Sequence, residues 1–195
     1  MAEGSTIRIV TESISRLPEH GLVPISFTVE SVLDVELLEG GLAGVRLSER
    51  TLDDPWVKDY DGTDGEGPAG WAQRFDLEHW GLIAAHHQDR RVGGAVIAFD
   101  TIGVDLLGGR QDLVVLWDIR VRPDARGAGV GAALFGAARS WAQARGCRTL
   151  KVETQNINVP ACRFYRRMGC ALASIDRFAY PQLPGEVQMI WQVEL

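Results

Sequence analysis

The stretch Arg126-Gly127-Ala128-Gly129-Val130-Gly131 constrains this chain more than any other, because it places conformational freedom between a predicted strand and a predicted helix. Three glycines at every second position allow backbone amides to converge on an anion without obstruction by Cβ atoms. The helix that follows adds unpaired N–H groups and a partial positive charge at its start. Arg122 and Arg126 add full charges nearby. The stretch therefore predicts a turn that binds an anion such as a phosphate.

Two other phosphate-binding patterns do not fit this stretch. The Walker A pattern requires a Gly-Lys-Ser or Gly-Lys-Thr ending, which is missing here. The dinucleotide pattern G-x-G-x-x-G differs as well, because Gly127, Gly129 and Gly131 follow a G-x-G-x-G spacing. A turn that makes only packing contacts is the remaining alternative, and the strand–turn–helix context favours the anion site over it.

Hydrophobic periodicity from residue 80 onward predicts the order β-β-β-α-β-α-β-β. The expected strands are Trp80–His87, Val92–Asp100, Leu113–Val121, Arg148–Thr154, Ala171–Tyr180 and Val187–Leu195, and the expected helices are 129–145 and 158–168. This order predicts an α+β chain (an α/β mixed sheet) covered by helices. In the first 50 residues we expect a strand at Ile7–Val10 and a short helix at Thr11–His20 that Pro18 and Gly21 limit, whereas Ile25–Leu38 stays ambiguous.

The strand before the glycines carries polar residues close to the turn. Alternation along a strand places Trp117, Ile119 and Val121 on one face. It places Asp118 and Arg120 on the opposite face. A carboxylate there can accept a proton directly or through water, and a solvent-facing or salt-bridged role is an equal alternative.

Residues Asp53–Gly70 form the clearest predicted loop, since they hold two prolines, four glycines, six acids and one lysine. Long loops in compact domains are often lids or binding segments, and a disordered acidic insert is an equal alternative. The acids would raise the local concentration of a cationic amine, or they form a solvated surface. They are Asp53, Asp54, Asp59, Asp61, Asp64 and Glu66.

Net charge is unevenly distributed along the chain. Residues 118–167 hold ten basic and three acidic side chains, a net charge of +7, against −13 for the rest and −6 in total. The acidic total argues against a nucleic-acid-binding protein. The basic segment suits an anion and the acidic remainder suits cations. With 195 residues, one domain spanning 1–195 is the expected organisation.

Several other classes of protein are disfavoured. Three cysteines without a C-x-x-C pair argue against a disulfide framework and a zinc ribbon. His86 and His87 are adjacent on a strand and point to opposite faces, so no metal site is expected there. No apolar run approaches the roughly 20 residues of a membrane span, and the N-terminus lacks a signal-peptide pattern. A cytoplasmic protein is expected.

Two motifs together resemble the Gcn5-related N-acetyltransferase (GNAT) superfamily. Its acetyl-CoA motif R/Q-x-x-G-x-G/A is matched by Arg126, Gly129 and Gly131. Its motif Asn-x-x-Ala-x-x-Phe-Tyr is matched in register from Asn158 to Tyr165, although Gly169-Cys170 replaces the usual Gly-Phe further on. The resemblance covers roughly residues 75–195. It implies the GNAT acyl-CoA N-acyltransferase fold, a central mixed β-sheet flanked by helices, and acetyl-CoA as cosubstrate.

The resemblance also implies which residues hold acetyl-CoA. The pyrophosphate would lie on backbone amides of the glycine turn. The preceding strand would pair with the pantetheine arm, and one of its N–H groups would donate to the thioester carbonyl. The expected cofactor-binding residues are Ile119, Arg120, Val121, Arg126, Gly127, Ala128, Gly129, Val130, Gly131, Ala132, Asn158, Phe164 and Tyr165. Because the family often forms dimers, a homodimer is a further expectation.

A finer resemblance is to streptothricin acetyltransferases, which acetylate an amine on the β-lysine arm of an antibiotic. Four segments carry it, namely 153–165, 117–119, 58–61 and 186–187. It implies a small cationic acceptor contacted by Asp59, Tyr60, Asp61 and Trp117. Acetylation of a protein lysine or N-terminus is the enzymatic alternative, and a non-catalytic acyl-CoA-binding sensor is the alternative from another class.

Acetyl transfer to an amine requires a proton acceptor for the ammonium and a proton donor for the departing thiolate. Tyr165 is the predicted general acid, since a tyrosine with a pKa of about 10 holds its proton at neutral pH. Asp118 is the favoured base, slightly ahead of Glu153, and transfer through water with neither is an equal alternative. A covalent route through Cys162 is disfavoured, because a lone helical cysteine is usually a small buried hydrophobe.

Overall fold

The computed structural model describes residues 7–62 and 67–195 of the chain. Asp64 and Glu66, two of the six acids in the predicted loop, lie outside the described residues. The chain divides into two compact units. The first unit comprises Met1–Ser26, Asp59–Val152 and Val193–Leu195, and the second comprises Phe27–Lys58 and Glu153–Gln192.

Seven strands form one mixed sheet in the order β1-β4-β5-β6-β7-β9-β8, and two further strands, β2 and β3, pair with each other. The strands are Ile7–Glu12 (β1), Phe27–Leu37 (β2), Val45–Lys58 (β3), Gly81–His87 (β4), Arg90–Phe99 (β5), Leu113–Val121 (β6), Thr149–Gln155 (β7), Ala171–Asp176 (β8) and Gln188–Glu194 (β9). The α-helices are Leu17–Gly21 (α1), Pro68–Arg74 (α2), Val130–Gln143 (α3) and Val159–Arg167 (α4). The predicted fold class and the predicted order of elements from residue 80 onward are confirmed. Within residues 7–62 and 67–195, no helix is long and apolar enough to span a membrane.

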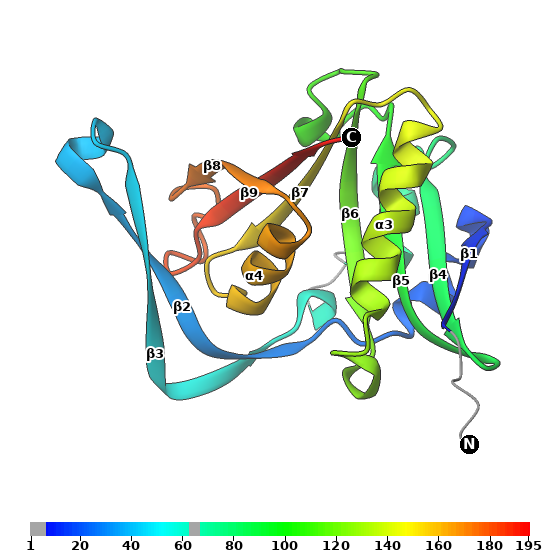
Figure 1. The fold of residues 1–195 in the computed structure, drawn as a ribbon, viewed down its shortest axis with the longest axis horizontal. Coiled ribbons are helices and arrows are strands. Elements are labelled where there is room, and N and C mark those ends of the chain that lie inside the picture. Colours follow the sequence, from blue (N-terminus) through cyan, green and yellow to red (C-terminus); the bar gives the residue numbers. More distant parts are fainter. Residues whose placement is uncertain (1–6, 63–66) are drawn as a thin grey trace. The chain divides into compact units, whose positions relative to one another are not determined.

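In the first unit, helices cover both faces of the antiparallel strands β1, β4, β5 and β6. Helix α3 lies along this part of the sheet (Figure 1). Gly93 of β5 approaches Val130 and Leu134 of α3, whereas the next residue, Gly94, approaches His20 of α1. Because successive residues of a strand point to opposite faces, α3 and α1 cover opposite faces of the sheet.

The face covered by α1 and α2 carries an aromatic cluster. Trp71 of α2 and Trp80 are buried there. Trp117 packs against both rings, with centroid separations of 6.2 Å to Trp71 and 5.4 Å to Trp80. Leu113 and Val115 of β6 belong to the same core. Each buried aromatic ring removes a large apolar area from water, so this cluster fixes the short helix α2 on the sheet.

A bulge in β6 overturns the predicted alternation of its side chains. Val96 pairs with Asp118, whereas the next residue of β5, Ile97, pairs with Leu116, so Trp117 is the extra residue. An extra residue in one strand shifts the side chains that follow it to the other face. Trp117 therefore lies on the α1 and α2 face together with Asp118, and not opposite it as predicted.

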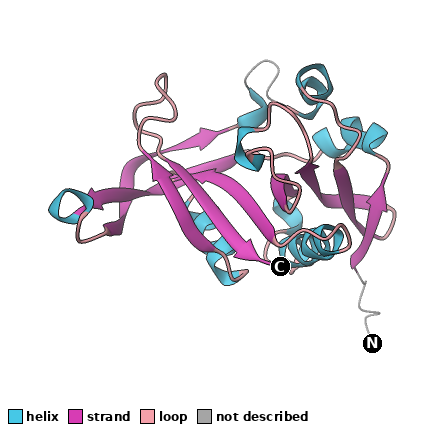
Figure 2. Cartoon of the chain, turned by 90° about the horizontal axis from the view of Figure 1, so that it is seen from above, coloured by secondary structure: helices cyan, strands magenta, loops and turns pink. Residues whose placement is uncertain are grey.

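In the second unit, β2 and β3 form a long antiparallel hairpin with the 3-10 turn Leu38–Gly41 at its tip (Figure 2). Helix α4 contacts β2 and β8, and β8 pairs with β9. The buried Asn156 joins these parts. Its main chain and side chain bond both backbone groups of Leu33 in β2, and its Oδ1 accepts from the Val187 N–H at 2.8 Å. A buried amide with its polar groups satisfied in this way fixes the hairpin to the rest of the unit.

The loop predicted at Asp53–Gly70 is wrong at its two ends. Residues 53–58 are the end of β3, Tyr60–Gly62 form a 3-10 turn, and α2 begins at Pro68. Pro55 favoured a loop because proline has no N–H for a strand ladder. In the structure it lies where the register between β2 and β3 shifts, so no regular ladder bond is needed there.

The beginning of the chain also differs from the prediction. Strand β1 continues to Glu12, and α1 begins only at Leu17, directly before Pro18 in its first turn. Proline is favoured at the first helical positions, so it marks the start of this helix rather than limiting a longer one. The ambiguous segment 25–38 becomes β2.

Candidate functional site

The glycine-rich turn connects β6 to α3 through the 3-10 turn Pro123–Ala125. Gly127 and Gly129 have φ angles of 79° and 82°, in the left-handed region that residues with a Cβ rarely adopt. Gly129 is the N-cap of α3 and offers no side-chain acceptor to its first turn. The N–H groups at the start of this 14-residue helix are therefore suited to an external anion.

The Arg126 side chain fixes the turn to its surroundings. Its Nε donates to the carbonyl oxygen of Val121 at 3.0 Å, and its Nη2 donates to that of Ser26 at 3.1 Å. These bonds tie the entry of the turn to the end of β6. The side chain is exposed, and its charge adds to the positive potential at the start of α3.

The two edges of β6 have different partners. Its parallel register with β7 covers Leu113–Val115 and Thr149–Lys151. On the other edge, the antiparallel register with β5 continues to Val121. Ile119–Val121 lie beyond this register with β7, and the edge of a strand can pair with an extended ligand.

A buried network of ionisable groups lies on the α1 and α2 face of β6. Arg120 is 2% exposed, and all five of its N–H donors have an acceptor. Nε and Nη2 donate to Asp118 at 2.9 and 2.6 Å, and Nη1 and Nη2 donate to Asp61 at 2.7 and 3.2 Å. Nη1 also donates to the carbonyl oxygen of Val23. His20 Nε2 lies 2.7 Å from Asp118 Oδ1.

These contacts determine the charge state of Asp118. Burial alone would raise the pKa of its carboxyl, but the hydrogen bonds from His20 and Arg120 outweigh burial and hold the pKa far below its usual range. The ionised carboxylate only accepts hydrogen bonds, so the Nε2–H of His20 donates to it. A carboxylate with such a low pKa is a weak proton acceptor at neutral pH. The network therefore weakens the prediction of Asp118 as the base.

Helix α4 of the second unit carries the second predicted motif. Asn158 is its N-cap, as predicted, and its side chain accepts from the Ala161 N–H at 3.2 Å. Tyr165 is buried at 5% exposure, and its ring makes an edge contact with that of Phe164. Burial raises the pKa of the Cys162 thiol to about 12. A thiol that holds its proton so strongly is a poor nucleophile, in agreement with the prediction against a covalent route.

Glu153 lies in a polar cluster of the second unit. Its two oxygens accept hydrogen bonds from the Tyr180 hydroxyl and from Gln188 Nε2. Gln155 Nε2 in turn donates to the Tyr180 oxygen at 2.9 Å. Unlike Asp118, Glu153 has no cationic partner in these contacts, so its carboxylate is oriented without being neutralised.

Comparison with known proteins agrees with this geometry. The sequence profile described as the Acetyltransferase (GNAT) family matches residues 49–170. The chain belongs to the GNAT family. It is 32% identical to a streptothricin acetyltransferase of Escherichia coli, over 85% of this chain and 83% of the relative. It is also 32% identical to a streptothricin acetyltransferase of Streptomyces lavendulae, over 80% of this chain and 76% of the relative.

Two solved structures share the fold over nearly the whole chain. The crystal structure of nourseothricin acetyltransferase is 26% identical and covers 96% of this chain and 98% of its own, with a TM-score of 0.73. A Bacillus anthracis structure in complex with acetyl coenzyme A is 21% identical, covers 97% and 100%, and has a TM-score of 0.75. As a GNAT member with these relatives, the protein is an acetyl-CoA-dependent N-acetyltransferase.

The residues predicted to contact substrate in this GNAT chain have different surroundings. Asp61 is paired with Arg120, and Trp117 belongs to the aromatic cluster, whereas Asp59 is exposed. The preceding residue, Lys58, forms an ion pair of 2.5 Å with the buried Glu186 in the second unit. The ion pair thus joins two residues of the second unit, Lys58 and Glu186, that stand in segments carrying the finer resemblance.

Some residues of these clusters were not found from the sequence. His20 lies 98 positions before Asp118, and a single histidine in a five-residue helix gave no signal for this contact. Tyr180 was placed in a predicted strand, but β8 ends at Asp176. Gly94 allows this packing, because a Cβ there would lie 2.4 Å from His20 Nδ1.

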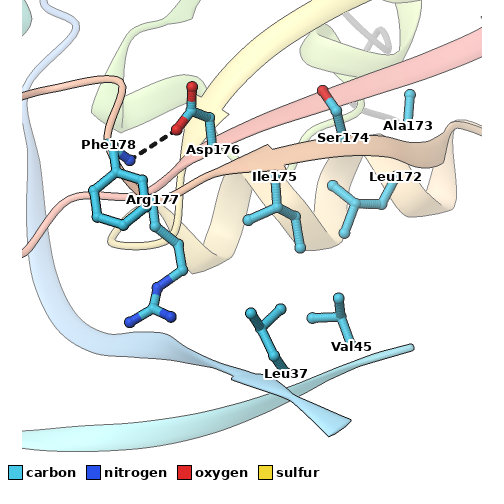
Figure 3. Close-up of a pocket in the computed structure, with 9 residues that line it drawn as sticks. All are labelled: Leu37, Val45, Leu172, Ala173, Ser174, Ile175, Asp176, Arg177 and Phe178. Carbon is cyan, nitrogen blue, oxygen red and sulfur yellow. Dashed lines mark hydrogen bonds between the residues drawn. The ribbon is translucent and has the colours of Figure 1, made fainter. Parts of the chain in front are cut away.

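A separate apolar pocket of about 480 Å³ lies in the second unit (Figure 3). It is formed by Leu37 and Val45 of the hairpin and by residues 172–178 of β8 and its continuation. Its polar groups are partly engaged within the chain, since Asp176 accepts from the Phe178 N–H at 2.8 Å. It contains none of the predicted site residues.

Proposed function

We propose that the protein transfers the acetyl group of acetyl-CoA to a primary amine of a small cationic substrate of the streptothricin type. The observation that carries this proposal is its similarity to two streptothricin acetyltransferases over at least 80% of the chain. The glycine turn at Arg126–Gly131, with the Arg126 charge and the start of α3, supports an anionic cosubstrate. The exposed carboxylate of Asp59 supports a cationic acceptor.

In this proposal, main-chain groups of the first unit hold acetyl-CoA. Amides of residues 126–132 bind the pyrophosphate, helped by the start of α3. The main chain of Ile119–Val121, beyond the described β7 register, pairs with the pantetheine arm. A β6 N–H stabilises the negative charge that develops on the thioester oxygen. The Arg120 side chain takes no part, because its donors are already engaged.

The proton transfers are assigned to Tyr165 and Glu153. The acceptor amine attacks the thioester carbon, the C–S bond breaks, and Tyr165 donates its proton to the departing thiolate. Glu153 receives the proton lost by the amine, directly or through water, because its carboxylate is oriented but not paired with a cation. Asp118 serves to hold Arg120 instead of acting as the base.

The test is a thiol-release assay with acetyl-CoA and four acceptors, namely streptothricin, a polyamine, an aminoglycoside and a lysine-containing peptide. We expect the highest kcat/KM for streptothricin, with one acetyl group added to the product by mass spectrometry. A higher kcat/KM for the peptide would overturn the small-molecule assignment. No release with streptothricin would overturn the substrate class.

The same assay tests the acid. Tyr165→Phe keeps the ring packing but removes the hydroxyl, so we expect kcat to fall about a hundredfold with little change in the KM for acetyl-CoA. Full turnover by this variant at saturating substrates would show that Tyr165 is not the acid.

A further inference from the structure

The 3-10 turn that carries Asp59 to Gly62 is attached to a buried guanidinium of the sheet. We propose that Arg120, supported by Asp118 and His20, is a positioning residue that holds this turn so that the Asp59 carboxylate meets the cationic acceptor. The inference rests on the proposed function for the identity of the acceptor. We call Asp61, Arg120, Asp118 and His20 the clamp. Asp61 belongs to the clamp, whereas Asp59 recognises the cationic acceptor.

Asp61 is poorly suited to bind an amine itself. Both of its oxygens accept from Arg120, at 2.7 and 3.2 Å. A bidentate carboxylate–guanidinium pair is both directional and charge-compensating, so a second cation would have to compete with a group already in place. The Asp61 side chain is 28% exposed, and that of Arg120 is 1% exposed. The pair is thus anchored from the buried side.

Two buried residues, Asp118 and His20, hold the Arg120 guanidinium in place. Asp118 accepts two of its hydrogen bonds and is itself bonded by His20, whose side chain is fully buried. His20 packs closely on Gly94, where a Cβ would lie 2.4 Å from its Nδ1. The guanidinium therefore has one defined orientation, which is the condition for a positioning role.

Asp59 is linked to this clamp through the main chain. Its Oδ1 accepts from the Asp61 N–H at 3.1 Å, and its carbonyl oxygen accepts from the Gly62 N–H at 3.4 Å. The carboxylate is exposed, and no ion pair engages it within the described part of the chain. Release of Asp61 would therefore free the turn that orients Asp59.

The main experiment compares the KM for streptothricin among four single variants and one double variant. Asp59→Asn should raise this KM about tenfold, with kcat and the KM for acetyl-CoA nearly unchanged, because a charged hydrogen-bond partner is lost. Asp61→Asn and Arg120→Lys should raise it by similar factors. The double variant Asp61→Asn, Arg120→Lys should raise the KM for streptothricin no further than either single variant, because either change releases the same clamp.

Arg110→Lys is the fourth single variant and the matched control. Arg110 forms an equally bidentate pair with Asp112, at 2.8 and 3.0 Å, but this pair is exposed and does not touch the turn. Its KM values should equal those of the wild type. If Asp61→Asn raises the KM while Asp59→Asn does not, or if the double variant multiplies the two single effects, Asp61 contacts the acceptor and the proposal is wrong.

A second measurement is independent of turnover. Amide hydrogen exchange at Asp61 and Gly62 should be about tenfold faster in Asp61→Asn and Arg120→Lys than in the wild type or in Arg110→Lys. Unchanged exchange would overturn the clamp whatever the kinetics show. Absence of streptothricin turnover by the wild type, with the expected exchange pattern, would instead refute the substrate assignment and leave the clamp in place. Should Arg120→Lys not fold, the half-buried Asp61→Asn carries the test.

Discussion

The glycine turn at Arg126–Gly131 and the acidic segment at Asp53–Gly62 differ in what fixes their backbone. In the turn, two glycines with positive φ and a helix start at Val130 define the conformation locally. In the acidic segment, one half is paired with β2 and the other half is held through Arg120 of β6. Glycine spacing thus constrains the main chain directly, whereas a run of charges leaves its conformation to distant partners.

The same difference changes how the uneven charge distribution along the sequence is interpreted. The sequence counts Arg120 as part of a basic segment and Asp61 as part of an acidic one. In the structure these two charges compensate each other, and neither is free for a ligand. Only exposed groups without such a partner, such as Asp59, retain the attraction that a charge count suggests.

The largest expected effect comes from the network behind the acidic segment. Asp118→Asn should lower the free energy of unfolding by about 3 kcal/mol at pH 7, because it removes the charge that compensates a buried guanidinium. The pKa of Asp118 is depressed in the folded state, so this stabilisation is complete above its ordinary pKa of 3.8 and is lost as the pH falls further. Urea unfolding between pH 7 and pH 3 measures both expectations.

Asp112→Asn serves as its control, since it breaks an exposed pair with Arg110. This variant should unfold at nearly the same urea concentration as the wild type. The difference in free energy of unfolding between wild type and Asp118→Asn could instead stay constant down to pH 3. That result would argue that the Asp118 charge does not stabilise the fold and that the acidic segment does not depend on this distant network.

A smaller effect is expected in the glycine turn. Gly129→Ala should destabilise the protein by about 1 kcal/mol and raise the KM for acetyl-CoA, because alanine is strained at a φ of 82°. Gly136→Ala within α3 is the matched control, since a Cβ there meets open space. It should stabilise the protein by roughly 0.5 to 1 kcal/mol with no change in KM. Equal effects of the two substitutions would show that the turn has no special local requirement.

The smallest effect is expected at the β3 end of the acidic segment. The double variant Asp53→Asn, Asp54→Asn should change the KM for streptothricin less than about twofold, because exposed charges on the hairpin are screened at physiological salt. Asp59→Asn is its positive reference. A tenfold rise in the KM for streptothricin of the double variant that disappears at high salt would show that the whole acidic segment attracts the acceptor electrostatically. The two halves of the segment would then not differ.

Much of the fold was predictable because its elements have strong local signals. The strand at Leu113–Val121 has the same bounds in the prediction and in the structure, and Asn158 caps α4 as expected. The first half of the acidic segment was mispredicted because Pro55 and the charges resemble a loop, while the pairing that makes residues 53–58 part of a strand comes from β2. The face of Trp117 was mispredicted because a bulge depends on the partner strand as well as on the residue itself.

The sequence by itself determined the mixed sheet, the position of the glycine turn before α3 and the membership of the GNAT family, because glycine spacing and hydrophobic period act over a few residues. Only the tertiary structure decided which charges are free. His20, Asp61, Asp118 and Arg120 come from a helix, a turn and a strand that are far apart in the chain, and their distances of 2.6–3.2 Å exist only after folding. In a buried site, an ion pair changes both the pKa of a side chain and its availability to a ligand. Neither property can be inferred from the sequence alone.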